Sequence, residues 1–209
     1  MKIAVIGASR GVGYELLKMA LEEGHDVTAL LRSPAKLMIS HPRLKIVNGD
    51  ILYPTSVSAV VAGNDAICLC IGIAPTRKPV DVFSRGAECV LAAMEKGAHQ
   101  KLISVTGIGA GDSKGHGGFI YDRLINPLLL GTIYADKDRQ ESIIKASAIE
   151  WLIVRPGFLT NGPRTGKYRV IENLSGVTAG KISRADVADF MLKQLATPTY
   201  FGKTPLLTY

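Results

Sequence analysis

The sequence has few cysteines and no hydrophobic run long enough for a membrane helix. Only three of its 209 residues are cysteine, which is too few for a disulfide framework. Cys68 and Cys70 lie two apart in an apolar stretch, so in a strand both point to the same face, and we interpret them as small buried hydrophobic residues. No apolar run approaches the ~18 residues of a membrane span, which argues against a membrane protein.

The chain also lacks a metal-ligand cluster and a basic tract. His, Cys and carboxylate residues nowhere have the spacing of a metal site, so we expect no metal. The formal net charge is +7, yet Lys and Arg are scattered, without runs or interleaved aromatic residues. This pattern argues against nucleic acid and favours an anionic cofactor. The N-terminus has no signal-peptide pattern, so the expected location is the cytoplasm.

The first 14 residues are the most informative part of the chain. Residues 2–6 are an apolar, β-branched run typical of a strand buried on both faces. A glycine-rich turn follows, and a helical pattern begins at Tyr14. Gly7 permits the tight turn, Gly11 lets phosphates approach the backbone, and Gly13 lets the helix pack close to the strand. Strand, glycine turn and helix in this order predict a dinucleotide site.

Strand and helix patterns alternate along the rest of the chain. The predicted strands are 26–31, 44–47, 65–71, 101–105, 151–154 and 204–208, and the predicted helices are 54–61, 80–96, 134–148 and one capped by Ser183. This alternation predicts an α/β, Rossmann-type fold: a doubly wound parallel β-sheet flanked by helices, in one domain over residues 1–209. Residues 108–133 interrupt this alternation. They contain several glycines and a short helical pattern at 119–125, which together predict a substrate lid.

Ligands of such sheets bind where the parallel strands end. The residues that follow the predicted strands at this edge are Gly7, Arg32, Asp50, Gly72 and Thr106. Within the glycine turn, the predicted cofactor-binding residues are Gly7, Ser9, Arg10, Gly11, Val12 and Gly13. We expect Asp50 to contact the adenine amino group and Ile51 to pack on the ring.

The tip of the second strand predicts which cofactor is bound. An acidic residue there binds the ribose 2′-hydroxyl of NAD, whereas a cation suits the 2′-phosphate of NADP. This chain has Arg32 and Ser33 at the tip, and Arg10 can reach the same region. Two guanidinium groups and a hydroxyl fit a phosphate, so we expect NADP(H) to be preferred over NAD(H).

Four motifs resemble one family over nearly the whole chain. They are the glycine turn at 7–13, Asn-Gly-Asp at 48–50, Arg-Pro-Gly at 155–157 and Ile-Ser-Arg-Ala-Asp-Val-Ala at 182–188. The sequence is similar to atypical short-chain dehydrogenases/reductases, and in particular to the NAD(P)H-binding proteins that include the flavin reductase/biliverdin-IXβ reductase. The resemblance implies hydride transfer to a planar acceptor, with the nicotinamide lined by Thr106, Gly107, Pro156 and Phe158. That reductase has serine in place of Gly107 and histidine in place of Phe158, which argues against biliverdin itself.

Tyr134 and Lys137 are the candidate catalytic residues. The glycine spacing is that of dehydrogenases with a Tyr-x-x-x-Lys pair, and here the pair is one residue shorter. Positions i and i+3 share a helix face roughly, so Tyr134 is either a proton donor whose pKa Lys137 lowers or a packing residue of the helix or lid. The resemblance implies that Lys137 holds the nicotinamide ribose.

Three functions follow from these patterns. The leading one is an NADPH-dependent reductase of a small planar acceptor such as flavin or quinone. The second is an NADP(H)-binding, redox-sensing regulator of the NmrA-like kind that acts through a protein partner. The third is a carbonyl reductase using Tyr134 and Lys137. The absence of a long apolar surface helix favours a monomer.

Overall fold

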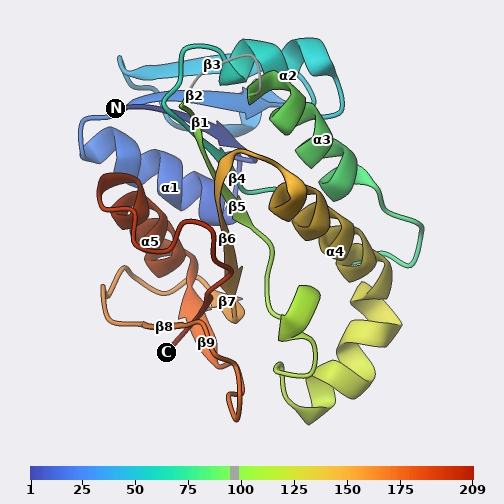
Figure 1. The fold of residues 1–209 in the computed structure, drawn as a ribbon. Coiled ribbons are helices and arrows are strands. Elements are labelled where there is room, and N and C mark those ends of the chain that lie inside the picture. Colours follow the sequence, from blue (N-terminus) through green and yellow to red (C-terminus); the bar gives the residue numbers. More distant parts are fainter. Residues whose placement is uncertain (95–98) are drawn as a thin grey trace.

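A mostly parallel eight-stranded sheet forms the middle layer of the protein (Figure 1). The computed structural model describes residues 1–94 and 99–209. The strand order is β3-β2-β1-β4-β5-β6-β10-β8. The parallel strands are β1 (Lys2–Ile6), β2 (Asp26–Leu31), β3 (Leu44–Asn48), β4 (Ala66–Leu69), β5 (Lys101–Val105), β6 (Glu150–Pro156) and β10 (Leu206–Thr208). Because β1 pairs with both β2 and β4, the winding direction reverses at β1, and such a switch point is where doubly wound sheets bind ligands.

Helices cover both faces of the sheet. On one face, α1 (Gly11–Glu22) packs against α5 (Arg184–Ala196), and on the other α2 (Pro54–Val61), α3 (Val82–Met94) and α4 (Gly131–Ala146) lie in a row (Figure 1). Alternate residues of β1 enter the two resulting cores, since Ile3 and Val5 belong to one and Ala4 and Ile6 to the other. The predicted doubly wound α/β fold is therefore confirmed, and its central strand is buried on both faces.

The C-terminal third departs from the prediction of an entirely parallel sheet. Strand β8 (Arg169–Ile171) pairs antiparallel with β10 at the sheet edge. A separate two-stranded sheet joins β7 (Phe158–Thr160) to β9 (Lys181–Ser183) and was not predicted. These three strands have three residues each, which is too short for a periodic signal. Ser183 caps α5 as predicted, by accepting a hydrogen bond from Asp186 N.

Residues 108–133 contain more helix than predicted. After the 3₁₀ turn η2 (Gly111–Ser113), a helix begins at Phe119 and continues as the π-helical stretch η3 (Tyr121–Leu130), which α4 follows directly. The expected helix 119–125 was thus too short, and α4 begins before the expected Tyr134. Phe119 is 75% exposed and Ile120 65%. The predicted end of α3 at Lys96 lies outside the described residues. Nowhere in residues 1–94 and 99–209 is a helix long and apolar enough to span a bilayer.

Candidate functional site

Two glycines are required where α1 meets β1 and β4. Gly7 has φ +94°, and a Cβ atom there would lie 2.5 Å from the carbonyl oxygen of Cys70. A Cβ atom on Gly13 would lie 2.4 Å from the carbonyl oxygen of Gly7. Since real side chains do not approach backbone so closely, the turn and the helix can pack in this way only with glycine at both positions.

The glycine turn leaves open space beside Gly11. Gly11 has φ +69°, and the atom nearest to its Cβ position is Arg184 Nε at 3.9 Å. Arg10 is the N-cap residue of α1 and makes no side-chain hydrogen bond there, so the first N–H groups of the helix are free to bind an anion. Ser9 and Arg10 are exposed, whereas Val12 is buried and anchors the turn. The residues present fit a dinucleotide phosphate.

Arg32, Ser33 and Asp50 lie at the ends of β2 and β3. The side chain of Arg32 is 74% exposed, and its Nη1 atom is 4.0 Å from Asp50 Oδ2. Asp50 Oδ1 accepts a hydrogen bond from the backbone N–H of Leu52 at 3.0 Å. Ser33 is exposed. The predicted cation for a 2′-phosphate is therefore accessible, with a carboxylate beside it.

Ile51 and Gly72 differ in how much surface they offer a cofactor. Ile51 is only 7% exposed, because it packs against α3, where a Cβ atom on Gly86 would lie 2.7 Å from Ile51 Cδ1. The structure thus places Ile51 in the core and leaves little of its side chain to meet an adenine ring. Gly72 follows β4, and no atom of the described residues lies within 4 Å of its Cβ position. This second glycine is open to a ligand.

Residues from three distant segments meet at the ends of β5 and β6. A Cβ atom on Gly107 would lie 3.2 Å from Tyr134 Oη, 3.8 Å from Lys137 Nζ and 3.9 Å from the carbonyl oxygen of Pro156. Thr106 precedes Gly107, and its N–H donates to Val154 O on β6 at 2.9 Å. The residues that sequence analysis assigned to the nicotinamide end are therefore neighbours in space.

Lys137 is held among a carbonyl and two aromatic rings. Its ammonium group donates a hydrogen bond to the carbonyl oxygen of Thr106. Its Nζ atom lies 5.4 Å from the ring centre of Phe83 and 5.3 Å from that of Tyr134. Burial lowers the pKa of Lys137 to about 8, against an opposing influence of the Glu141 carboxylate. The group therefore loses its proton close to neutral pH.

The Tyr134 hydroxyl faces Tyr121. Tyr121 Oη donates to Tyr134 Oη at 3.0 Å and also lies 3.2 Å from the carbonyl oxygen of Ile108. Burial, and then the neighbouring Tyr121, raise the pKa of Tyr134 above its usual value. The Lys137 ammonium group lies over the Tyr134 ring, 5.3 Å from its centre, so both alternatives for Tyr134 stay predictions. Tyr134 is held in its neutral form.

Phe158 contacts the segment between β5 and α4. It opens β7, where its N–H donates to Gly180 O at 2.9 Å, and its side chain remains 36% exposed. The Tyr121 ring meets it edge to face, with ring centres 5.0 Å apart. An exposed aromatic surface in this position is suited to stacking against a planar molecule.

A buried ion pair that sequence analysis missed supports Thr106. Glu141 and Arg155 are each 1% exposed, and their closest approach is 2.6 Å, between Oε2 and Nη2. Glu141 Oε1 also accepts a hydrogen bond from Thr106 Oγ1 at 2.8 Å. Arg155 makes a second ion pair, 2.6 Å long, with the exposed Asp112. No sequence pattern pairs Glu141 on α4 with Arg155 on β6, because the two residues belong to different elements.

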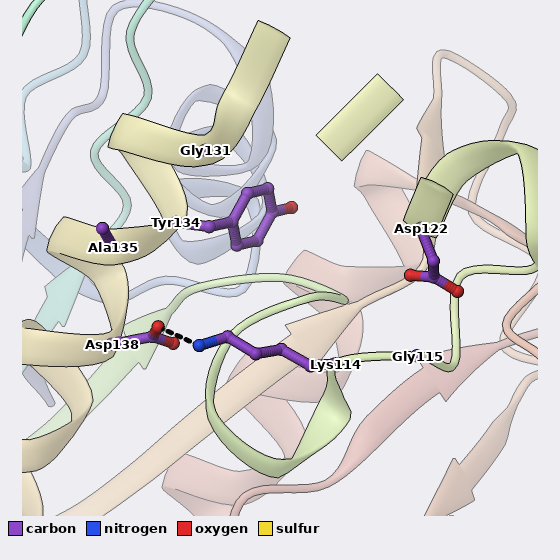
Figure 2. A pocket seen from close by; sticks show the side chains of 7 residues that line it. All are labelled: Lys114, Gly115, Asp122, Gly131, Tyr134, Ala135 and Asp138. Carbon is purple, nitrogen blue, oxygen red and sulfur yellow. Dashed lines mark hydrogen bonds and ion pairs between the residues drawn. The ribbon is translucent and has the colours of Figure 1, made fainter. Parts of the chain in front are cut away.

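A cavity of about 300 Å³ lies between α4 and the segment that precedes it (Figure 2). Tyr134 projects from α4 toward Asp122, and the ion pair between Lys114 and Asp138 lies below it in the view. The cavity is lined by Lys114, Gly115, Asp122, Gly131, Tyr134, Ala135 and Asp138. The predicted lid segment therefore leaves a space on one side of Tyr134 that charged and apolar groups line together.

The cysteines have no features of a reactive site. Cys68 is buried and Cys70 partly buried, and neither forms a disulfide. Burial raises the pKa of the Cys70 thiol to about 12, so it is not a thiolate at neutral pH. In the part of the chain that the structure describes, no group of three or more His, Cys, Asp or Glu side chains could hold a metal ion.

Comparison with known proteins places the chain among pyridine-nucleotide-binding proteins. It is 31% identical over 209 residues to the uncharacterized chloroplastic protein At2g34460 of Arabidopsis thaliana, covering 93% of this chain and 71% of that one. The structure is similar to ChuY, an anaerobilin reductase from Escherichia coli O157:H7, with a TM-score of 0.85, 25% identity, and coverage of 100% and 97%.

A short-chain dehydrogenase/reductase from Veillonella parvula, solved in complex with NADP, has the same fold. Its TM-score is 0.81 at 14% identity, with coverage of 100% of this chain and 94% of that one. The sequence model of the NAD(P)H-binding family matches residues 7–198. Since that range is nearly the whole chain, this protein belongs to the NAD(P)H-binding family. It has the fold of NAD(P)H-binding oxidoreductases.

Proposed function

We propose that the protein is an NADPH-dependent reductase that transfers hydride to a small planar acceptor, such as a flavin or a quinone. The observation that carries the proposal is the ring of Phe158, which is 36% exposed and meets Tyr121 edge to face. Tyr121 in turn bonds to Tyr134, which lies with Lys137 next to Gly107. A flat acceptor stacked on Phe158 would lie over the nicotinamide end of the site. That ChuY, a protein of similar structure, is an anaerobilin reductase supports a reductase activity.

The proposed preference for NADPH rests on charge. Arg10 and Arg32 are exposed cations near the ends of β1 and β2, where the 2′-phosphate would lie. The NADP bound to the Veillonella parvula protein of the same fold agrees with this. When bound, NADPH supplies hydride from nicotinamide C4.

The residues of the chain then have binding and positioning roles. Lys137 would hold the ribose hydroxyls, while its bond to Thr106 O keeps the ammonium group close to β5. Phe158 would align the acceptor. Tyr134 would line the edge of the site, with its hydroxyl group neutral. Hydride transfer between two stacked rings needs alignment and exclusion of water more than acid–base groups.

The proposal predicts turnover with NADPH and planar acceptors. NADPH oxidation, followed by absorbance, should occur with FMN or a quinone, and more slowly with NADH. Tyr134→Phe should keep this activity within about threefold of wild type, because stacked hydride transfer does not use its proton. A carbonyl reductase would instead lose about 10²-fold or more in the same variant. Tight NADPH binding without turnover on any acceptor would contradict the reductase proposal.

The proposal also predicts that activity falls as pH rises through about 8, the pKa of Lys137. The protonated form is the one that donates hydrogen bonds, so kcat/KM for NADPH should be level below this pH and should decline above it. Lys137→Arg should move the decline to higher pH, since a guanidinium group does not titrate there. Lys203→Arg replaces an exposed lysine paired with Glu172 and should leave the profile unchanged. A wild-type profile that is level to about pH 10 would contradict this role.

One observation favours the regulator as a second candidate. Four large apolar side chains of the segment before α4 are more than half exposed: Phe119, Ile120, Leu124 and Leu128. Exposed apolar residues that gather on one segment often mark a protein interface. The acceptor assay separates the candidates, because a regulator would bind NADPH tightly and transfer hydride to none of the acceptors.

A further inference from the structure

The last helix brings an arginine to the glycine turn. Arg184 is the first residue of α5 and follows β9 directly. Because α5 packs along α1, the Nε atom of Arg184 lies 3.9 Å from the Cβ position of Gly11. More than 170 residues separate Arg184 from Gly11 in the sequence, so only the tertiary structure brings the guanidinium group to the turn.

Among the described residues, the structure pairs Arg184 with an amide and not with a carboxylate. Its Nη1 atom donates to Asn161 Oδ1 at 2.7 Å, and among residues 1–94 and 99–209 no carboxylate forms an ion pair with it. By contrast, Arg155 and Arg164 bind carboxylates at 2.6 Å and 2.5 Å. An amide oxygen orients a guanidinium group but leaves its charge available to an anion.

The neighbouring groups point to the chemistry of that anion. Gly11 leaves room beside the guanidinium group, and the first N–H groups of α1 have no side-chain cap. A cation beside a free helix N-terminus adds its own hydrogen bonds to those of the helix N–H groups on a phosphate. Since Arg32 lies instead at the end of β2, the two arginines would meet different phosphates of the same cofactor.

The two-stranded sheet links this cation to the acceptor end of the site. Strand β7 begins at Phe158 and leads to Asn161, while its partner β9 leads to Arg184. At about 3.3 Å per residue, Asn161 lies about 10 Å along the chain from Phe158. The same small sheet thus presents an aromatic ring at one end and a tethered guanidinium group at the other.

We propose that Arg184, oriented by Asn161, binds the pyrophosphate of the dinucleotide beside the N-terminus of α1. The inference rests on the cofactor placement of the proposed function, but not on the identity of the acceptor. Since NADPH and NADH share the pyrophosphate, Arg184 contributes equally to the affinity for both. Arg32 acts on the 2′-phosphate and therefore on NADPH alone.

Fluorescence titration of the whole protein with NADPH and with NADH tests this assignment. Arg184→Gln should raise Kd for both cofactors by about the same factor, roughly tenfold, which is typical of a lost charged hydrogen bond. Arg32→Gln should raise Kd for NADPH alone by a similar factor. Arg43→Gln is the matched control, because Arg43 is an exposed arginine that binds Gly24 O at the far end of α1, and it should change neither Kd.

A second variant keeps the test decisive if Arg184→Gln does not fold. Asn161→Ala retains the charge and releases the guanidinium group from its tether, and it should weaken binding of both cofactors about threefold. Unchanged affinities in both variants, or a loss confined to NADPH, would overturn the assignment. If the wild-type protein reduces no acceptor while Arg184→Gln weakens both cofactors, the reductase proposal fails and this one stands.

Discussion

Gly7→Ala is expected to lower the free energy of unfolding by about 2–5 kcal/mol. An alanine at φ +94° is strained by about 1–2 kcal/mol, and its Cβ atom would lie 2.5 Å from Cys70 O. Relieving that contact means moving the turn away from the end of β4, and such overpacking costs about 1–3 kcal/mol. Urea unfolding followed by circular dichroism measures the change, and NADPH affinity should fall with it, because the turn is displaced.

Gly63→Ala is the matched control for this prediction. Gly63 has a similar positive φ of +71°, but no atom of the described residues lies within 4 Å of its Cβ position. Its replacement should therefore cost only the backbone strain, about 1–2 kcal/mol, and leave cofactor affinity unchanged. The difference between the two variants isolates the contact with Cys70 O. If the two variants were equally destabilised, the contact with Cys70 O would be relieved at no cost in free energy.

Glu141→Ala is expected to destabilise the protein by about 3–5 kcal/mol, because it removes one partner of a buried ion pair. Arg155 is 1% exposed and would keep only its contact with the exposed Asp112. Thr106 would lose the acceptor of its hydroxyl at the same time. Urea unfolding again measures the change, and kcat/KM for NADPH should fall as well, since Thr106 borders Gly107 and Lys137.

Glu150→Ala provides the comparison for a surface ion pair. Glu150 is 49% exposed and lies 3.8 Å from Lys101 across β5 and β6, so its removal should cost about 0–1 kcal/mol. If Glu141→Ala were as mild as Glu150→Ala, the buried pair would make no net contribution to stability.

Much of the candidate site could be predicted because its signals are local. Gly7 and Gly13 are fixed by the backbone around them, and strand ends follow from runs of apolar residues. Since parallel strands end at one edge of a sheet, the sequence also predicted that Arg32, Gly72 and Thr106 share that edge. The structure confirms the strands, and comparison confirms the NAD(P)H-binding family.

Other features depend on contacts between elements distant in the chain. Ile51 was predicted to pack on the adenine ring. In the structure its side chain packs in the core, where Gly86 on α3 has no side chain to occupy the space. Burial and the neighbouring Tyr121 raise the pKa of Tyr134, whose role as proton donor or packing residue the sequence left open. No local sequence pattern predicts the surroundings of Ile51 or Tyr134, because these depend on which residues of distant elements pack against each side chain.

The sequence by itself determined the fold, the family and the edge at which the parallel strands end, because periodicity and glycine placement act within a few residues. The tertiary structure alone decided which charges are compensated. Packing pairs Glu141 with Arg155 inside the protein, and it gives Arg184, beside the glycine turn, an amide partner in place of a carboxylate among the described residues. Burial and electrostatic pairing depend on the surroundings of a group in three dimensions, and the order of residues along the chain does not fix them.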